Sequence, residues 1–211
     1  MEQGELFDAG AAVERASTLD DLREAAAGCK ACDLWRSGTQ TVFGEGSRGA
    51  ALLFVGEQPG DREDREGRPF VGPAGRLLDQ ALEEVGIERR LAYVTNVVKH
   101  FKWTPRGKRR IHAKPNWSEI AACKPWLDAE VAVVRPRVIV CLGATAAQAL
   151  LGRDFRVTRQ RGEVVDSGYD GIPAIATVHP SSILRAEDED RERELSAFVD
   201  DLAAIKRFVE A

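Results

Sequence analysis

The stretch ALLFVGE (residues 51–57) decides the fold, because it is a short apolar run that ends at a glycine and a charged residue. A run of this length that stops at a turn is typical of a buried β-strand. The segment GPAGRLLDQALEEVGI (72–87) follows, with a proline near its start and apolar residues at helical spacing. A buried strand followed by an amphipathic helix predicts a parallel sheet covered by helices.

The same alternation continues to the end of the chain. Further strands are expected at 91–98, 137–143 and 172–180, and further helices at 116–134, 144–152 and 192–210. The sequence therefore predicts an α/β protein in which residues 1–211 form a single domain, with a central four-stranded parallel sheet flanked by helices. Residues 1–16 are expected to be poorly ordered or peripheral.

The composition suits one cytoplasmic, monomeric domain. The chain has 211 residues, of which 44% are hydrophobic, enough for one full core. No apolar run approaches the length that crosses a bilayer. The N-terminal MEQGELFDAG lacks the basic and apolar regions of a signal peptide. We therefore expect no membrane partner.

The net charge of −4 hides an uneven distribution of charge. The stretch 99–114 holds four lysines, three arginines and two histidines without an acidic residue, whereas 187–194 is mainly acidic. Burying so many unpaired charges would cost too much, so the basic stretch is expected to face water or a polyanion such as nucleic acid. A merely soluble surface loop is the alternative. The acidic stretch is interpreted as the solvated start of the last helix.

Four cysteines, Cys29, Cys32, Cys123 and Cys141, indicate a metal site. In a cytoplasmic protein disulfides are disfavoured, and four thiolates suit either zinc or an iron–sulfur cluster. The first two form a C-x-x-C motif, but seventeen residues separate the second two. Zinc ribbons usually have two tight pairs, so this spacing favours a cluster. The alternative for Cys141, which lies within an apolar strand, is a small buried core residue.

Side chains that could take part in binding or catalysis follow the ends of the expected strands, where ligands bind in parallel α/β sheets. Glu57 leaves the first strand into a Pro-Gly turn, Asn96 ends the second, and His179 ends the fourth. Phe70 is flanked by glycines and prolines that place its ring on a loop. Singly, each has a plainer interpretation as a turn former, a structural residue or a core residue. Together they predict a carboxylate, an amide, an imidazole and an aromatic ring on one rim beside the basic stretch.

Six motifs in this order resemble one family. They are TQTVFGEG (39–46), GEQPG (56–60), GRPFVGPAG (67–75), TNVVKH (95–100), KRRIH (108–112) and HPSSILR (179–185). This set resembles the iron–sulfur uracil-DNA glycosylases, and more narrowly their UdgX branch, which bonds covalently to the DNA it has acted upon. The marks of that branch are GEQPG and KRRIH. The resemblance implies a uracil-DNA glycosylase-like fold and a DNA-repair function on uracil-containing DNA, single-stranded or double-stranded.

The resemblance also implies a role for each matching residue. A [4Fe–4S] cluster would be held by Cys29, Cys32, Cys123 and Cys141. Uracil would be flipped out of the stack and bound by Gln58, Asp61, Phe70, Asn96 and His179. Phe70 would stack on the base, Asn96 would read its O4 and N3 edge, and His179 would donate to O2. DNA would be contacted by Lys99, Lys108, Arg109, Arg110, Ser181, Leu184 and Arg185.

The catalytic residues implied are Glu57, His112 and His179. Cleavage of the glycosidic bond leaves positive charge on the sugar, which Glu57 can stabilise, and negative charge on uracil, which His179 can stabilise. His112 would then bond to C1′ of the deoxyribose as a neutral nucleophile, with Glu57 orienting it.

Three rival interpretations remain open. The nearest is a conventional turnover glycosylase that releases uracil and a free abasic site. A non-catalytic nucleic-acid binder that uses the metal as a scaffold is the second. The third is a zinc-stabilised nucleotide-binding module.

Overall fold

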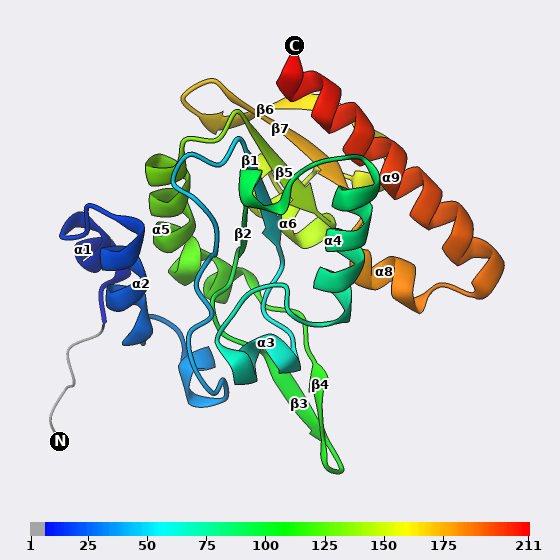
Figure 1. Ribbon diagram of the computed structural model, residues 1–211. Coiled ribbons are helices and arrows are strands. Elements are labelled where there is room, and N and C mark those ends of the chain that lie inside the picture. Colours follow the sequence, from blue (N-terminus) through cyan, green and yellow to red (C-terminus); the bar gives the residue numbers. More distant parts are fainter. Residues whose placement is uncertain (1–6) are drawn as a thin grey trace, which may run out of the picture.

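A five-stranded sheet forms the middle layer of the computed structural model, which describes residues 7–211 (Figure 1). The strand order is β2-β1-β5-β7-β6. The strands are β1 (Leu52–Gly56), β2 (Ala92–Asn96), β5 (Val138–Leu142), β6 (Val164–Tyr169) and β7 (Ile172–Thr177). All neighbouring pairs are parallel except β6 and β7. The predicted α/β fold with four parallel strands is confirmed, and an antiparallel edge strand is added to it.

The edge strand β6 was not expected because its residues do not form an apolar run. Val164 is exposed and the strand carries Asp166 and Ser167. The turn into β7 is Asp170-Gly171, and both residues have positive φ, as a two-residue hairpin turn requires. The Asp-Gly pair before an apolar strand is the sequence signal that predicts this hairpin.

Helices cover both faces of the sheet, and side-chain alternation along the strands assigns each face. Leu52 and Phe54 of β1 pack with α4 (Pro73–Glu84) and α9 (Asp188–Glu210), whereas Leu53 faces the other way. Figure 1 shows α4 and α9 on one side of the sheet and α1, α2 and α5 on the other. The remaining helices are α1 (Ala9–Glu14), α2 (Leu19–Ala27), α3 (Asp61–Glu66), α5 (Trp117–Val134), α6 (Ala144–Leu151), α7 (Val157–Gln160), α8 (Pro180–Arg185), η1 (Asp33–Arg36) and η2 (Arg89–Leu91). Within residues 7–211 no helix combines the length and apolarity that a membrane crossing needs.

The N-terminal segment is part of the core where the structure describes it. Ala9 and Ala12 of α1 are buried, and the Phe7 ring lies 6.4 Å from the Trp126 ring of α5, centroid to centroid. The expectation that residues 1–16 are peripheral is therefore wrong for this helix, and residues 1–6 lie outside the described part. A small apolar helix face packs on α5, which the short N-terminal sequence did not make evident.

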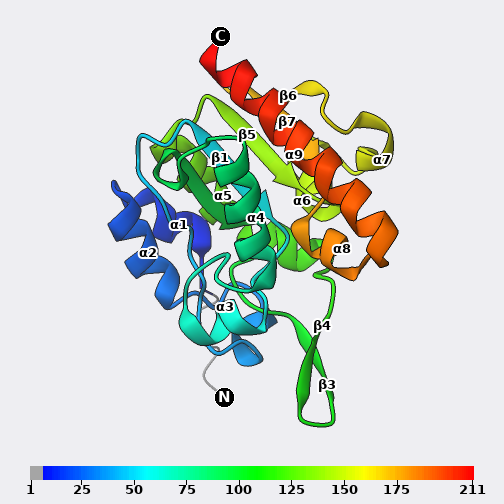
Figure 2. The same ribbon diagram turned by 45° about the vertical axis from the view of Figure 1, so that its right-hand side comes forward.

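The basic stretch forms an antiparallel hairpin, β3 (Trp103–Arg106) and β4 (Arg109–His112). Gly107 has φ of +60° in its turn, a conformation that glycine adopts without strain. The hairpin extends from the body of the protein below α3 in both ribbon views (Figures 1 and 2). Its open end lies at the carboxyl ends of β1 and β2. Side chains of the hairpin can therefore reach the edge of the sheet where ligands are expected.

Candidate active site at the carboxyl ends of the strands

The predicted rim residues converge on Gly56, the last residue of β1. A methyl group added to Gly56 would overlap Asn96 Oδ1 and come within 2.9 Å of Phe70 Cζ and 3.5 Å of His179 Nε2. Gly56 pairs directly with Asn96 of β2 in the sheet. Three side chains from separate segments thus converge over Gly56 with an amide oxygen, a ring edge and an imidazole nitrogen.

Phe70 is held in a strained backbone conformation beside this space. Its φ of +57° is unusual for a bulky residue and costs on the order of 1–3 kcal/mol. A Cβ at Gly75 would overlap the Phe70 carbonyl, so the following helix can approach only because glycine stands there. The ring lies 6.2 Å from the His179 ring at an interplanar angle of 29°. Strain at this position points to a functional placement of the ring.

Glu63 holds the two loops on either side of the pocket and was not found from the sequence. Its carboxylate is largely buried, and it accepts hydrogen bonds from Gly60 N at 3.1 Å and Gly72 N at 2.7 Å. One carboxylate therefore joins the GEQPG loop to the loop that carries Phe70. The available signal is the glutamate three residues after the N-cap glycine of α3, which forms the half of a capping box that a glycine N-cap allows.

His179 is arranged as a neutral hydrogen-bond donor. Its Nδ1 accepts from Ser181 N at 3.1 Å, which places the ring proton on Nε2, the nitrogen that faces the pocket. Burial lowers the pKa of His179 to about 4, with Glu57 opposing and Arg185 assisting the shift. The ring is therefore uncharged near neutral pH. Because an unfolded histidine titrates near 6.5, the neutral form contributes stability that is present above that pH and is lost as the pH falls toward 4.

Glu57 contacts two groups from different parts of the chain. Its Oε1 lies 3.2 Å from His112 Nε2, and its Oε2 accepts a hydrogen bond from Thr145 Oγ1 at the start of α6. Burial alone would raise the pKa of Glu57, but the hydrogen bonds with His112 and Thr145 outweigh it and hold the pKa below its ordinary value. Glu57 is thus a carboxylate at neutral pH, oriented by Thr145, a residue that the sequence did not single out.

The Gln58 side chain forms hydrogen bonds with both strands' ends at the open end of the hairpin. Its amide donates to Lys102 O and Ala113 O, both at 3.1 Å, and accepts from Lys102 N at 3.1 Å. The side chain is therefore engaged by the hairpin, which leaves only its backbone for the expected pocket role. Lys102 precedes β3 and Ala113 follows His112, so these bonds set where His112 leaves the hairpin.

Two residues expected at the pocket and on DNA instead bind each other. Asp61, expected to line the uracil pocket, accepts from Arg110, expected to contact phosphate. Arg110 also pairs with Asp64 at 2.6 Å, and only 16% of its side chain is exposed. The expectation of a phosphate contact is wrong for Arg110 in this structure, because its guanidinium is already paired with two carboxylates, whereas the pocket role of Asp61 stays a prediction.

Lys99 is a further correction to the DNA-contacting set. Its side chain is buried, and its ammonium pairs with Glu130 at 2.6 Å and donates to Thr95 Oγ1 and Asn96 O. His100 is buried as well. The expectation that the whole 99–114 stretch faces water fails here, because a buried charge is tolerated when a counter-charge and hydrogen bonds surround it.

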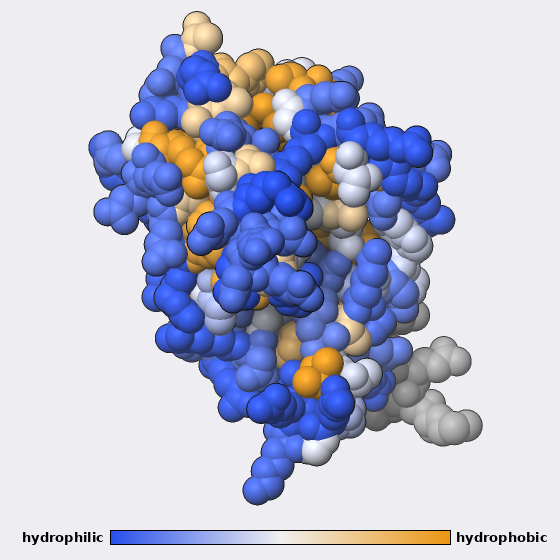
Figure 3. All heavy atoms as spheres, turned by 90° about the vertical axis from the view of Figure 1, so that its right-hand side faces the viewer, coloured by the Kyte–Doolittle hydropathy of each residue, from blue (hydrophilic) through white to orange (hydrophobic). Residues whose placement is uncertain are grey.

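The other expected DNA-contacting residues lie on accessible surface. Lys108 and Arg109 are exposed at the hairpin turn, and Leu184 and Arg185 are exposed on α8. Ser181 is half-buried and supports His179, as described above. The face in Figure 3 is mostly hydrophilic around the apolar residues it exposes, with the hairpin at its lower end. These exposed groups lie on the β3–β4 hairpin, which carries His112, and on α8, which directly follows His179.

Three of the four cysteines gather beside α5, and the fourth does not. The pKa of the Cys123 thiol is raised to about 12, chiefly by burial, with Lys99 opposing the rise and the nearby Cys29 and Cys32 adding to it. Lys99 N donates to Cys123 Sγ at 3.2 Å, and Trp126 Nε1 to Cys29 Sγ at 3.3 Å.

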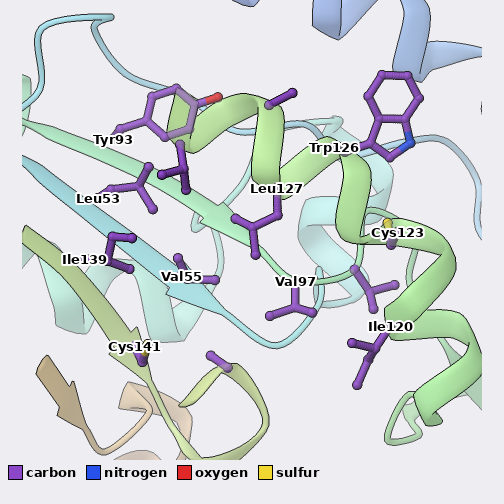
Figure 4. Packing of buried hydrophobic residues seen from close by; sticks show 14 of the residues in the cluster. Leu53, Val55, Tyr93, Val97, Ile120, Cys123, Trp126, Leu127, Ile139 and Cys141 are labelled. Atoms are coloured by element: carbon purple, nitrogen blue, oxygen red, sulfur yellow. The ribbon is translucent and has the colours of Figure 1, made fainter. Parts of the chain in front are cut away.

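Cys141 lies on β5 among the sheet residues, well apart from Cys123 in Figure 4. Burial alone raises its pKa to about 12, without a contribution from the other thiols. The plainer interpretation, a small buried core residue, describes Cys141 best. In residues 7–211 no three histidine, cysteine or acidic side chains surround a point as a single metal ion would require.

Comparisons with known proteins identify the family of the chain. The family model of the uracil DNA glycosylase superfamily matches residues 43–203. The Type-4 uracil-DNA glycosylase of Thermotoga maritima is 39% identical over 197 residues, 92% of this chain and 96% of the relative. The Type-4 uracil-DNA glycosylase of Sulfurisphaera tokodaii is also 39% identical, over 79% of this chain and 76% of the relative. A Type-5 uracil-DNA glycosylase of Pyrobaculum aerophilum is 32% identical over 65% of this chain. The chain therefore belongs to the uracil DNA glycosylase superfamily.

Proposed function

We propose that this protein is a uracil-DNA glycosylase that flips uracil out of DNA and cleaves its N-glycosidic bond. The observation that carries the proposal is the space at Gly56, where Asn96, Phe70 and His179 converge. Its walls are the groups that a planar base with alternating donors and acceptors needs. The Type-4 relatives support the same substrate by name.

Each wall of the pocket has a distinct task. Phe70 offers a ring for stacking, and Asn96 offers an amide that can both donate and accept, as the O4 and N3 edge of uracil demands. Cytosine presents the opposite pattern at that edge and would leave Asn96 mismatched. His179, neutral with its proton on Nε2, can donate to O2 as negative charge develops on the departing base.

The proposed role of Glu57 is to stabilise charge on the sugar. Its pKa is held below the ordinary range, so it is a carboxylate that can stabilise positive charge at C1′ as the base departs with the bonding electron pair. Thr145 fixes its second oxygen. The positive charge on the sugar and the negative charge on uracil are thus stabilised by two preorganised groups on the same rim, Glu57 and His179.

We further propose that His112 captures the sugar covalently, as in the UdgX branch. A ring nitrogen of the neutral imidazole forms a bond to C1′ while the C1′–N1 bond breaks and uracil leaves as an anion. Glu57, 3.2 Å from His112 Nε2, is positioned to accept the remaining imidazole proton. The exposed half of the His112 side chain gives the sugar access to the ring.

The experiment uses an end-labelled oligonucleotide with a single uracil, mixed with the protein or with His112→Ala and run on a denaturing gel. We expect the wild-type protein to produce a band that is heavier by the mass of the protein and resists heat and detergent. His112→Ala should lose this band entirely, yet leave an alkali-labile abasic site. A thymine oligonucleotide is the control and should show neither product.

The outcomes separate the two levels of the proposal. An alkali-labile site without a heavier band in the wild type would refute covalent capture and leave a turnover glycosylase, the second candidate that the Type-4 relatives favour. Absence of both products would refute the glycosylase itself. Running single-stranded and duplex substrates in parallel determines which form of DNA is used.

We also propose that an iron–sulfur cluster binds beside α5 through Cys29, Cys32 and Cys123, with His100 as the fourth ligand. His100 directly follows Lys99, whose backbone amide donates to Cys123 Sγ at 3.2 Å, so this part of the chain lies against the Cys123 thiol. Its Nε2 lies 3.2 Å from Thr41 Oγ1, which donates to Ala26 O near the C-x-x-C motif. When bound, the cluster would link the N-terminal segment to the core as a structural group.

Iron content tests this ligand set with a matched pair of buried cysteines. We expect Cys123→Ala and His100→Ala to lose most of the iron and the visible absorbance, and Cys141→Ala to retain both. Circular dichroism of each variant controls for folding. Loss of iron from a folded Cys141→Ala would restore the set of four cysteines that the sequence predicted.

A further inference from the structure

Alternation along β4 places Arg110 and His112 on the same face of the hairpin. Residues two apart in a strand point the same way, and their neighbours Arg109 and Ile111 point the opposite way. The structure agrees, because Arg109 and Ile111 are exposed whereas Arg110 turns toward α3. The two adjacent arginines of the KRRIH motif are therefore in different environments.

Arg110 is bound at several points to the body of the protein. Its guanidinium pairs with Asp61 and Asp64, the first and fourth residues of α3, and Nη1 also donates to Thr39 Oγ1 at 3.2 Å. Asp64 is buried and also accepts from Thr39 N at 2.8 Å. Asp61 also pairs with Arg65 at 3.0 Å, so two carboxylates match two guanidiniums and Arg110 has no unpaired charge to offer a phosphate. The arrangement suits an anchor inside the protein and does not suit a DNA contact.

The anchor is connected to the catalytic carboxylate by a short piece of chain. Asp61 follows Glu57 by four residues and begins α3, directly after the loop that leaves β1. Gln58 of the same loop binds Lys102 O and Ala113 O at the open end of the hairpin. The segment from Gln58 to Asp64 therefore binds the chain on both sides of His112, at Arg110 and at Ala113.

We propose that Arg110, with Asp61 and Asp64, is a positioning residue that holds the hairpin so that His112 faces Glu57 and the sugar. This inference rests on the proposed covalent capture and deepens it. Arg110 touches neither base nor sugar in this role. It acts by fixing the backbone two residues before the nucleophile, while the pocket at Gly56 is formed without the hairpin, by β1, β2 and the loops that carry Phe70 and His179.

The experiment compares Arg110→Ala with Arg109→Ala, two neighbouring arginines on opposite faces. The readout is the rate of adduct formation divided by the rate of uracil release, measured in single-turnover reactions at several salt concentrations. Arg110→Ala should lower this ratio by about 10²-fold, the typical cost of misplacing a reacting group by about 1 Å. Arg109→Ala should lower both rates together and reduce their salt dependence, leaving the ratio unchanged.

Two more variants guard against a simple loss of folding. Asp61→Asn removes one partner that is 42% exposed, so the fold should survive while the ratio falls. Arg110→Lys, which cannot engage both carboxylates in the same way, should fall between wild type and Arg110→Ala. A folded Arg110→Ala protein with the wild-type ratio would overturn the inference while covalent capture stands. A wild type that forms no adduct would overturn covalent capture itself.

Discussion

Gly56→Ala should reduce uracil excision by at least about 10²-fold, the loss expected when reacting groups are displaced by about 1 Å. The new methyl group would overlap Asn96 Oδ1 and press within 2.9 Å of Phe70 Cζ, in the space assigned to the base. Gly56 does not have positive φ, so the effect arises from the methyl group and not from the backbone. The measurement is single-turnover release of labelled uracil.

Gly49→Ala is the matched control for this prediction. A methyl group at Gly49 meets nothing within 4 Å, so excision should stay at the wild-type rate. The thermal midpoints of both variants should be compared, since the Gly56 variant must remain folded for the result to count. Wild-type excision by folded Gly56→Ala would show that the base binds elsewhere.

Lys99→Met should lower the free energy of unfolding by about 3–5 kcal/mol, because it leaves the Glu130 carboxylate buried without its counter-charge. For a chain of this size such a loss corresponds to a fall in the thermal midpoint of roughly 6–20 °C. Glu130 would retain only neutral donors, Gly44 N, Tyr93 OH and Thr95 Oγ1. Thermal or denaturant unfolding followed by circular dichroism measures the change.

Two comparisons make the result specific to the buried pair. Lys99→Met combined with Glu130→Gln should recover most of the lost stability, since the uncompensated charge is gone. Arg62→Met removes the exposed ion pair with Glu66 and should cost less than about 1 kcal/mol. A Lys99→Met variant as stable as Arg62→Met would mean that Lys99 is not buried as a charged group.

The Lys99–Glu130 pair also joins the two functional regions of the protein. Lys99 Nζ donates to the backbone oxygen of Asn96, and Lys99 N donates to Cys123 Sγ. A residue expected on the DNA-binding surface thus lies between Asn96, which we propose reads the base, and the Cys123 thiol. Its charge supports the interior of the site, whereas the exposed charges of Lys108 and Arg109 remain available to a polyanion.

The sequence alone determined the four parallel strands and the rim on which Glu57, Asn96 and His179 lie. Each buried strand is a local apolar run, and the residue that follows such a run must emerge at the carboxyl edge of a parallel sheet. Phe70 was predicted on a loop because its neighbours are glycine and proline. These inferences depend on residues close together in the chain, which is why they could be drawn without the tertiary structure.

Only the tertiary structure decided which charges and thiols reach which partners. Lys99 is buried because Glu130, 31 residues away, meets it, and Arg110 is anchored because Asp61 and Asp64 lie opposite β4. Cys141 belongs to a strand whose place in the sheet separates it from the other thiols. The free energy of a charge or a ligand depends on the groups packed around it, and in a folded chain those groups come from distant segments.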